Sequence, residues 1–397
     1  MTDPVQPQGS YMMTKCLGVI LATMMLLGCG GAGSSENPPP CFQPQPGVYY
    51  LNRDAIFVAN AGSSSISALQ VVGPYIPAGP VCGSPFPLSA PPTGLAGGAV
   101  LTVLSGPGKM ISLFKVDFLT SVLTGPTAVL ATSQTPVSAI AWGNYFYVAN
   151  AEGNVSVYSV SVDGTAITEI PGSPFPAGSS PAGIAAAGGV TGQWLYVANS
   201  KSNNISAYRL DAASGVPTPL PGSPFLAGTN PSSIDATPLD PLHGGPTLAV
   251  VANAGSNDVS AYLVGADGSL APVGGSPFPA GAGPSSVTIG HIFYPVNSVY
   301  VANSKSNSIS GYAVDDATGM LTPLAGSPFP AGSTPSSVTE GTWSGAFGLF
   351  LYVANSASND LSVFSVGLST GALTPVAGSP YPVGQSPSAV RYVEVPQ

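Results

Sequence analysis

Short apolar runs alternate along the chain with polar turns, and no stretch shows the 3.6-residue period of a helix. Residues 350–354 are continuously apolar, which predicts a strand that is covered on both faces. Residues 309–314 alternate small and larger side chains, which predicts a half-buried strand. The polar residues 303–307 favour a hairpin loop, because Asn tolerates left-handed backbone geometry. The pattern therefore predicts antiparallel strands joined by short turns.

This pattern repeats about every fifty residues, and a unit of that length cannot bury its own apolar face, so the copies must stack on one another. A Val-Ala-Asn phrase marks each copy, and Ser105 takes the place of the Asn in a degenerate copy within residues 101–117. The marker residues of the other copies are Asn60, Asn150, Asn199, Asn253, Asn303 and Asn355. The chain therefore contains seven copies.

Each copy predicts four strands. A short run such as residues 286–288 precedes the Tyr-Val-Ala-Asn strand and is expected to be innermost. The last strand contains a proline, which cannot donate to a sheet ladder, so we expect this strand at an outer edge. These prolines are Pro219, Pro272, Pro323 and Pro375. The predicted fold is an all-β, seven-bladed β-propeller of four-stranded antiparallel blades.

Two further features concern how blades join. The phrase Gly-Ser-Pro-Phe-Pro could place a ring of aromatic side chains against a ligand, or its prolines could stiffen the passage between blades while each Phe fills a gap between sheets. We favour the second interpretation. Residues 389–395 predict a strand that enters the first blade and closes the ring, which leaves residues 48–51 as a spare strand. That strand would lie at an edge or mediate weak self-association.

The N-terminal part predicts export. The apolar run 16–27 has the length of a signal-peptide core, and Gly28-Cys29 resembles the cleavage site of a bacterial lipoprotein, although an ordinary signal peptide is an alternative. We therefore expect a signal peptide at 1–28, a lipidated Cys29 with a Gly/Ser/Pro tether at 29–46, and the propeller at 47–397. The expected location is the cell envelope, as an outer-membrane or surface lipoprotein.

The composition argues against one class of function, nucleic-acid binding. Eight Lys and Arg stand against seventeen Asp and Glu, a formal net charge of −9, so the chain lacks the clustered cations of a nucleic-acid surface. Cys41 and Cys82 would be free to pair in an exported compartment, or they could remain as two free thiols. No cofactor is expected.

Candidate chemistry lies where the copies differ. His243 and His291 fall in equivalent loops of adjacent blades, and Glu340 belongs to the next blade, so the three side chains could together hold a metal ion. No His-Glu-x-x-His spacing occurs, and we predict no metal site.

The Tyr-Val-Ala-Asn, Ser-Asn-x-Ile-Ser and Thr-Gly-x-Leu-Thr-Pro phrases resemble the YVTN-type repeats of the lactonase-like seven-bladed propeller family, over residues 48–395. That family includes 6-phosphogluconolactonases, cycloisomerases and exported proteins. The resemblance implies a polar cleft at one end of the channel, with a general base and cations. Arg391, in an expected channel strand, and His243, His291 and Glu340 are the candidate residues.

Three functions remain in view. The low charge and the predicted anchor favour a non-catalytic lipoprotein that binds an unidentified protein or glycan. The family resemblance instead indicates a lactonase-like hydrolase acting on a sugar lactone or another neutral lactone. The spare terminal strand allows a self-assembling structural surface protein.

Overall fold

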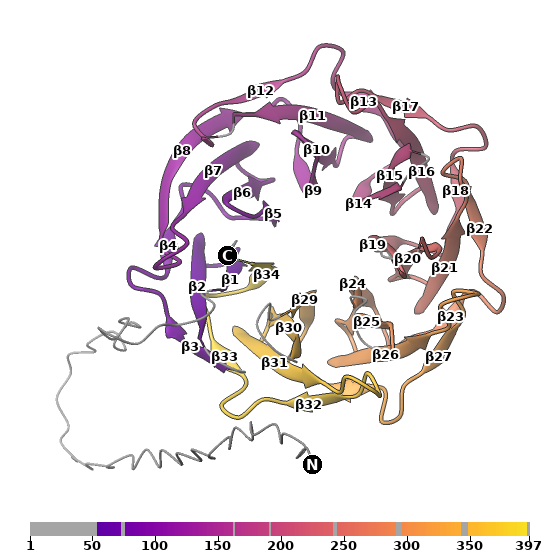
Figure 1. The fold of residues 1–397 in the computed structure, drawn as a ribbon. Coiled ribbons are helices and arrows are strands. Elements are labelled where there is room, and N and C mark those ends of the chain that lie inside the picture. The colour runs from indigo at the N-terminus through magenta and orange to yellow at the C-terminus, as the bar shows by residue number, and fades with distance from the viewer. Residues whose placement is uncertain are drawn as a thin grey trace, which may run out of the picture. The chain divides into compact units, whose positions relative to one another are not determined.

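The computed structural model describes residues 54–72, 76–161, 163–189, 192–240, 244–290, 296–342 and 348–394. The chain divides into two units, Met1–Pro38 and Pro39–Gln397, and the described residues all belong to the second. They form seven antiparallel sheets, or blades, arranged around a central channel (Figure 1). No helix in the ranges given above is long and apolar enough to cross a membrane.

The blades are numbered in chain order, and their strands are given from the channel outward. The first blade comprises β34 (Pro387–Val393), β1 (Ala55–Asn60), β2 (Ser65–Val72) and β3 (Ile76–Pro80), with β4 (Phe86–Pro87) also on β2. The second comprises β5 (Gly94–Gly97), β6 (Val100–Ser105), β7 (Met110–Val116) and β8 (Leu123–Ala131). The third comprises β9 (Pro136–Trp142), β10 (Tyr145–Asn150), β11 (Asn154–Val160) and β12 (Ile167–Glu169), with β13 (Phe175–Pro176) on β11.

The remaining blades repeat this order. The fourth comprises β14 (Pro181–Gly189), β15 (Gly192–Asn199), β16 (Asn204–Leu210), β17 (Pro217–Pro219) and β18 (Phe225–Leu226). The fifth comprises β19 (Pro231–Pro238), β20 (Thr247–Asn253), β21 (Asp258–Val264), β22 (Leu270–Pro272) and β23 (Phe278–Pro279). The sixth comprises β24 (Pro284–Gly290), β25 (Ser298–Asn303), β26 (Ser308–Val314), β27 (Leu321–Pro323) and β28 (Phe329–Pro330). The seventh comprises β29 (Pro335–Thr342), β30 (Leu349–Asn355), β31 (Asp360–Val366), β32 (Leu373–Pro375) and β33 (Tyr381–Pro382).

The predicted architecture is confirmed. Each proline-containing last strand forms the outer edge of its blade, as Pro323 does in β27. The C-terminal strand β34 pairs antiparallel with β1, opposing Val390 to Val58, so the two ends of the propeller close the ring within one sheet. The spare strand expected at residues 48–51 lies outside the described residues. The structure adds a two-residue strand from the linker, such as β28, which pairs with the third strand of its own blade.

The marker asparagines are not loop residues, which corrects the expectation that residues 303–307 form the hairpin loop. Asn303 ends β25 and is fully buried, while the second asparagine of the phrase, Asn307, has the left-handed backbone (φ 53°) that the turn requires. The Asn303 Nδ2 donates to Ser310 Oγ at 3.0 Å and to Ser308 Oγ at 3.3 Å on the next strand. The amide nitrogen of Asn303 can be buried without a desolvation cost because these two hydroxyls accept its hydrogens.

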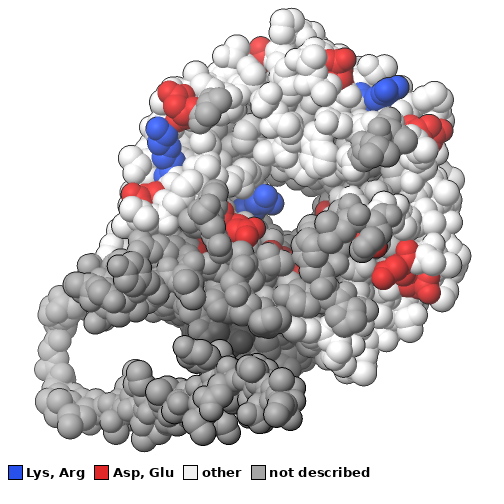
Figure 2. Space-filling model, viewed as in Figure 1, with Lys and Arg blue, Asp and Glu red and all other residues white. Residues whose placement is uncertain are grey.

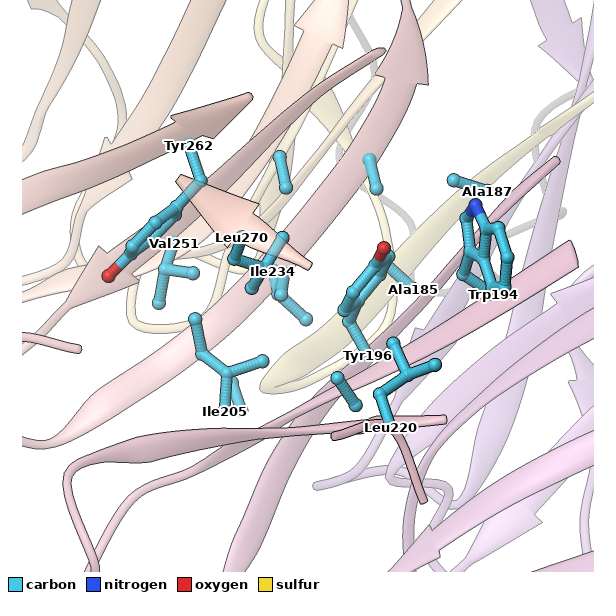
Figure 3. Packing of buried hydrophobic residues seen from close by; sticks show 14 residues of the cluster. Ala185, Ala187, Trp194, Tyr196, Ile205, Leu220, Ile234, Val251, Tyr262 and Leu270 are labelled. Carbon is cyan, nitrogen blue, oxygen red and sulfur yellow. The ribbon is translucent and has the colours of Figure 1, made fainter. Parts of the chain in front are cut away.

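The hydrophobic core lies between neighbouring blades. Figure 3 shows one cluster, in which Tyr196 and Trp194 of the fourth blade pack with Ile234, Val251 and Tyr262 of the fifth. The Tyr196 hydroxyl donates to the Gly268 carbonyl of the fifth blade at 2.9 Å. Each blade thus buries its face against the next, as the repeat length requires.

The linker phrase has a structural role, in agreement with the interpretation that we favoured. The Ser223 hydroxyl accepts the Ala207 backbone N–H of the third strand at 2.9 Å, beyond the point where the short strand β17 ends. Phe225 packs against the core cluster between the fourth and fifth blades. Equivalent serines accept from the third strand in five other blades.

Candidate functional site

Charged residues are rare on the seven innermost strands. They are Asp235 on β19, Glu340 on β29 and Arg391 on β34, so three blades supply all of the charge on the strands that line the channel. The part of the molecule coloured in Figure 2 carries few charged side chains on the face shown, and a basic side chain lies in the central opening. Because Arg391 is the basic residue on these strands, it supplies the positive charge of the channel.

Arg391 reaches from the first blade toward its neighbour. Its Nε donates to the Gly97 carbonyl at 3.2 Å, at the end of β5 in the second blade. This bond fixes the direction of the side chain, and in the described part of the chain the terminal guanidinium nitrogens have no hydrogen-bond partner. They remain available to a ligand with carbonyl or carboxylate oxygens, for which the planar guanidinium is suited.

Asp235 is held by backbone groups of two blades. Its Oδ2 accepts the Ile289 N–H at 2.8 Å from the sixth blade, and its Oδ1 accepts the Ala236 N–H at 2.8 Å. These two bonds fix the direction of the carboxylate between the fifth and sixth blades.

Arg391 and Asp235 interact across the channel. Burial lowers the pKa of the Arg391 guanidinium, and the Asp235 carboxylate acts in the opposite direction. The first and fifth blades are not neighbours in the ring, so this interaction passes through the channel interior. Arg391 has an exposed side chain that is nevertheless surrounded by protein, as expected inside a solvent-filled channel. It keeps its charge at neutral pH, since arginine ionises far above that range.

Glu340 lies on the seventh blade, facing the sixth. A Cβ built on Gly290 would stand 2.6 Å from the Glu340 Oε2, so the absence of a side chain at Gly290 makes room for the carboxylate. His243 and His291, which the sequence placed beside Glu340, lie outside the described residues. Their loops connect β19 to β20 and β24 to β25. Within the described ranges, no three His, Cys, Asp or Glu side chains gather as a metal site would require.

Of the four cysteines, Cys82 lies in the described ranges. Cys82 is disulfide-bonded, and its partner lies outside the described residues, as do Cys29 and Cys41. The pairing of Cys41 with Cys82 therefore stays a prediction.

Sequence reasoning missed Asp235. Asp235 and Arg391 each occupy the fifth position of their strand, counted from its opening proline, and the intervening blades carry Thr288 and Thr339 at that position. An alignment of the innermost strands would have placed the two charges in one layer of the channel.

The fold defines a seven-bladed β-propeller, and the charged residues of its innermost strands lie on three of the blades. Residues 99–294 and 296–392 match the family described as Lactonase, 7-bladed beta-propeller. The chain belongs to this family. No curated protein matches it.

Solved structures share the fold. The periplasmic gluconolactonase of Pseudomonas aeruginosa is 18% identical with a TM-score of 0.67, over 86% of this chain and 99% of that one. A protein of Bacteroides fragilis described as a "putative 6-phosphogluconolactonase" is 16% identical with a TM-score of 0.68, over 88% of this chain and 100% of that one. A Bacteroides uniformis protein described in the same words is 17% identical with a TM-score of 0.66, over 86% and 100%. At these identities the likeness establishes the fold alone.

Proposed function

We propose that this protein hydrolyses a lactone in the charged layer of its channel. The observation that carries the proposal is that Arg391 and Asp235 lie in one layer of the channel on non-adjacent blades, close enough to act on each other electrostatically, with the terminal nitrogens of Arg391 left for a ligand. Membership of the lactonase family and the names of its structural relatives support the same reaction class. This favours hydrolysis over the non-catalytic binding function that composition alone suggested.

In the proposed hydrolysis, Arg391 and Asp235 have different roles. The Arg391 guanidinium donates to the lactone carbonyl oxygen and stabilises the negative charge that develops there as water adds to the carbonyl carbon. The Asp235 carboxylate, fixed by its two backbone bonds, accepts the proton of that water. The ring C–O bond then breaks, the ring oxygen takes the proton that Asp235 had accepted, and the product is a hydroxy acid with the Asp235 carboxylate restored.

The substrate should be uncharged. The innermost strands carry two carboxylates and one guanidinium, a net charge of −1, so a phosphate dianion would meet one cation and two repelling groups. A lactone without a phosphate group fits this balance better than a phosphorylated one. We therefore propose a neutral lactone, including unphosphorylated sugar lactones.

The test measures hydrolysis of glucono-δ-lactone and of its 6-phosphorylated form by the purified protein. We expect turnover of the neutral lactone, weaker turnover of the phosphorylated one, and a loss of at least about 100-fold in kcat/KM in Arg391→Ala, the usual effect of removing an oxyanion donor. Arg209→Ala is the matched control, because Arg209 lies outside the channel on β16, over the Trp194 ring at 5.9 Å. Turnover unaffected by Arg391→Ala, or no turnover across a panel of lactones, would contradict the proposal and return the binding function to first place.

We also propose that the protein is exported and anchored through a lipid on Cys29. The apolar run 16–27 and Gly28-Cys29 support this, and one structural relative is named as periplasmic. In cells grown with labelled palmitate, we expect label on the full chain that Cys29→Ser abolishes and Cys41→Ser leaves intact. Label that persists in Cys29→Ser would rule out this anchor.

A further inference from the structure

The channel contains a chamber beside the layer of Arg391 and Asp235, and it has no role in the proposed hydrolysis. A cavity of about 270 Å³ is lined by the second and third positions of all seven blades, counted from Pro92 in the second blade, and by the fourth position in five of them. Arg391 and Asp235 occupy the fifth position, so the chamber lies beside the charged layer, toward the end of the ring where the blade linkers enter. None of the described residues that line the chamber is charged.

One wall of the chamber presents hydroxyl donors. Ser233, Ser286 and Ser337, on the fifth, sixth and seventh blades, each accept a backbone N–H from the following blade, at 3.3, 3.2 and 3.2 Å. Each hydroxyl also carries its own hydrogen, for which the described residues offer no acceptor. The three serines therefore hold three O–H donors in adjacent blades.

The residues that precede these serines present acceptors. Ser232, Ser285 and Ser336 each donate to the carbonyl of the next blade's first proline, at 2.8, 2.7 and 2.7 Å. Their hydrogens are used, and their oxygen lone pairs remain. Donors and acceptors thus alternate along the same three blades.

The fourth blade supplies the least polar part of the wall, with Ala182, Gly183 and Ile184. The neighbouring third blade contributes Val137 and Ala139 with a single hydroxyl, that of Ser138. The result is a neutral cavity with a hydroxyl wall on the fifth to seventh blades and a more apolar wall on the third and fourth.

We propose that this chamber binds a single neutral sugar residue. A pyranose has hydroxyls around its edge, which both donate and accept, and apolar C–H groups on its faces, so its two kinds of surface match the two walls. The volume suits a ligand smaller than a drug-sized molecule. An anionic sugar acid is disfavoured because the chamber offers no cation. This site is separate from the charged layer and does not depend on the proposed hydrolysis.

Binding is tested by titration of the full-length protein with methyl glucoside, methyl galactoside and myo-inositol, followed by ligand-observed NMR, with gluconate as the charged comparison. For a ligand of this size we expect a Kd in the millimolar range for at least one neutral probe and no binding of gluconate at this site. Ser233→Ala, Ser286→Ala and Ser337→Ala combined should weaken binding about tenfold or more. Ser159→Ala, on the third strand of the third blade, is the matched control.

A second variant tests the proposal even if the triple serine mutant fails to fold. Ala182→Leu fills the chamber from the apolar wall and leaves every serine hydrogen bond in place, so it should abolish binding while circular dichroism stays unchanged. Arg391→Ala should leave sugar binding intact, and the serine variants should leave lactone hydrolysis intact, so failure of one proposal is distinguishable from failure of the other. Absence of binding by all three neutral probes, or equal binding by Ala182→Leu, would overturn the proposal.

Discussion

In six of the seven blades the second strand ends in an asparagine that holds three segments of the chain together. In the sixth blade, Asn303 bonds two serines of the next strand, and one of them, Ser310, also accepts the backbone N–H of Gly281 from the preceding linker at 3.1 Å. A Cβ on Gly281 would stand 2.7 Å from Asn303 Cγ, so the glycine is needed for this close approach. The repeated Asn, Ser and Gly positions thus serve packing, and they leave the ligand to residues that vary between copies.

Replacing Asn303 by Ala should destabilise the propeller by about 1–3 kcal/mol, because two buried hydrogen bonds are lost and the serine hydroxyls lose their donor. Urea unfolding followed by tryptophan fluorescence measures this. Lys305→Ala, an exposed change on the same hairpin, should stay within about 0.5 kcal/mol of the parent. If both variants unfold at the same urea concentration, the asparagine does not hold the blade as described.

At the scale of the strands, the sequence predicted more of the scaffold than of the site. Period-two patterning and proline positions identified four strands per blade and the outer edge, because both follow from backbone hydrogen bonding. The two-residue strand β28 was missed, since Phe-Pro is too short to show a period. Asp235 was missed for a different reason. Its importance comes from facing Arg391 across the ring, and that relation between distant blades has no signature in either strand alone.

The same limit applies to the serine-lined chamber. Along the chain, Ser232 and Ser233 form one more small, polar dipeptide, and their hydrogen-bond partners in the following blade are 52 and 54 residues away in the sequence. What separates donor from acceptor is the hydrogen bond each hydroxyl makes to the following blade, at 2.8 Å to a carbonyl for Ser232 and at 3.3 Å from an N–H for Ser233. The chemistry of the channel is therefore set by contacts between blades.

At the scale of the whole molecule, the ring depends on a junction between its two ends. The strand β34 pairs with β1, and the Tyr392 hydroxyl donates to the buried Asp54 Oδ2 at 2.6 Å, just before β1 begins. The Tyr392 ring also stacks on Tyr352 of the seventh blade, with ring centroids 6.0 Å apart. Burial and the Asp54 carboxylate raise the pKa of the Tyr392 phenol, so it remains a donor at neutral pH. Arg391 is the preceding residue, which places the channel cation on the closing strand.

Tyr392→Phe keeps the stacked ring and removes the bond to Asp54, so it should cost about 1.5–3 kcal/mol of unfolding free energy, the range for a hydrogen bond to a charged group. Because the lost contact joins residues 338 positions apart, the loss should fall on the closure of the ring, and hydrogen exchange should rise first in β1 and β34. Tyr381→Phe is the matched control, since the Tyr381 hydroxyl makes an exposed bond to the Ala377 carbonyl at 3.1 Å. Lactone hydrolysis should weaken in Tyr392→Phe as the closing strand loosens around Arg391, and should be unchanged in Tyr381→Phe. Uniform exchange across all seven blades in Tyr392→Phe would show that the junction is no weaker than the rest of the ring.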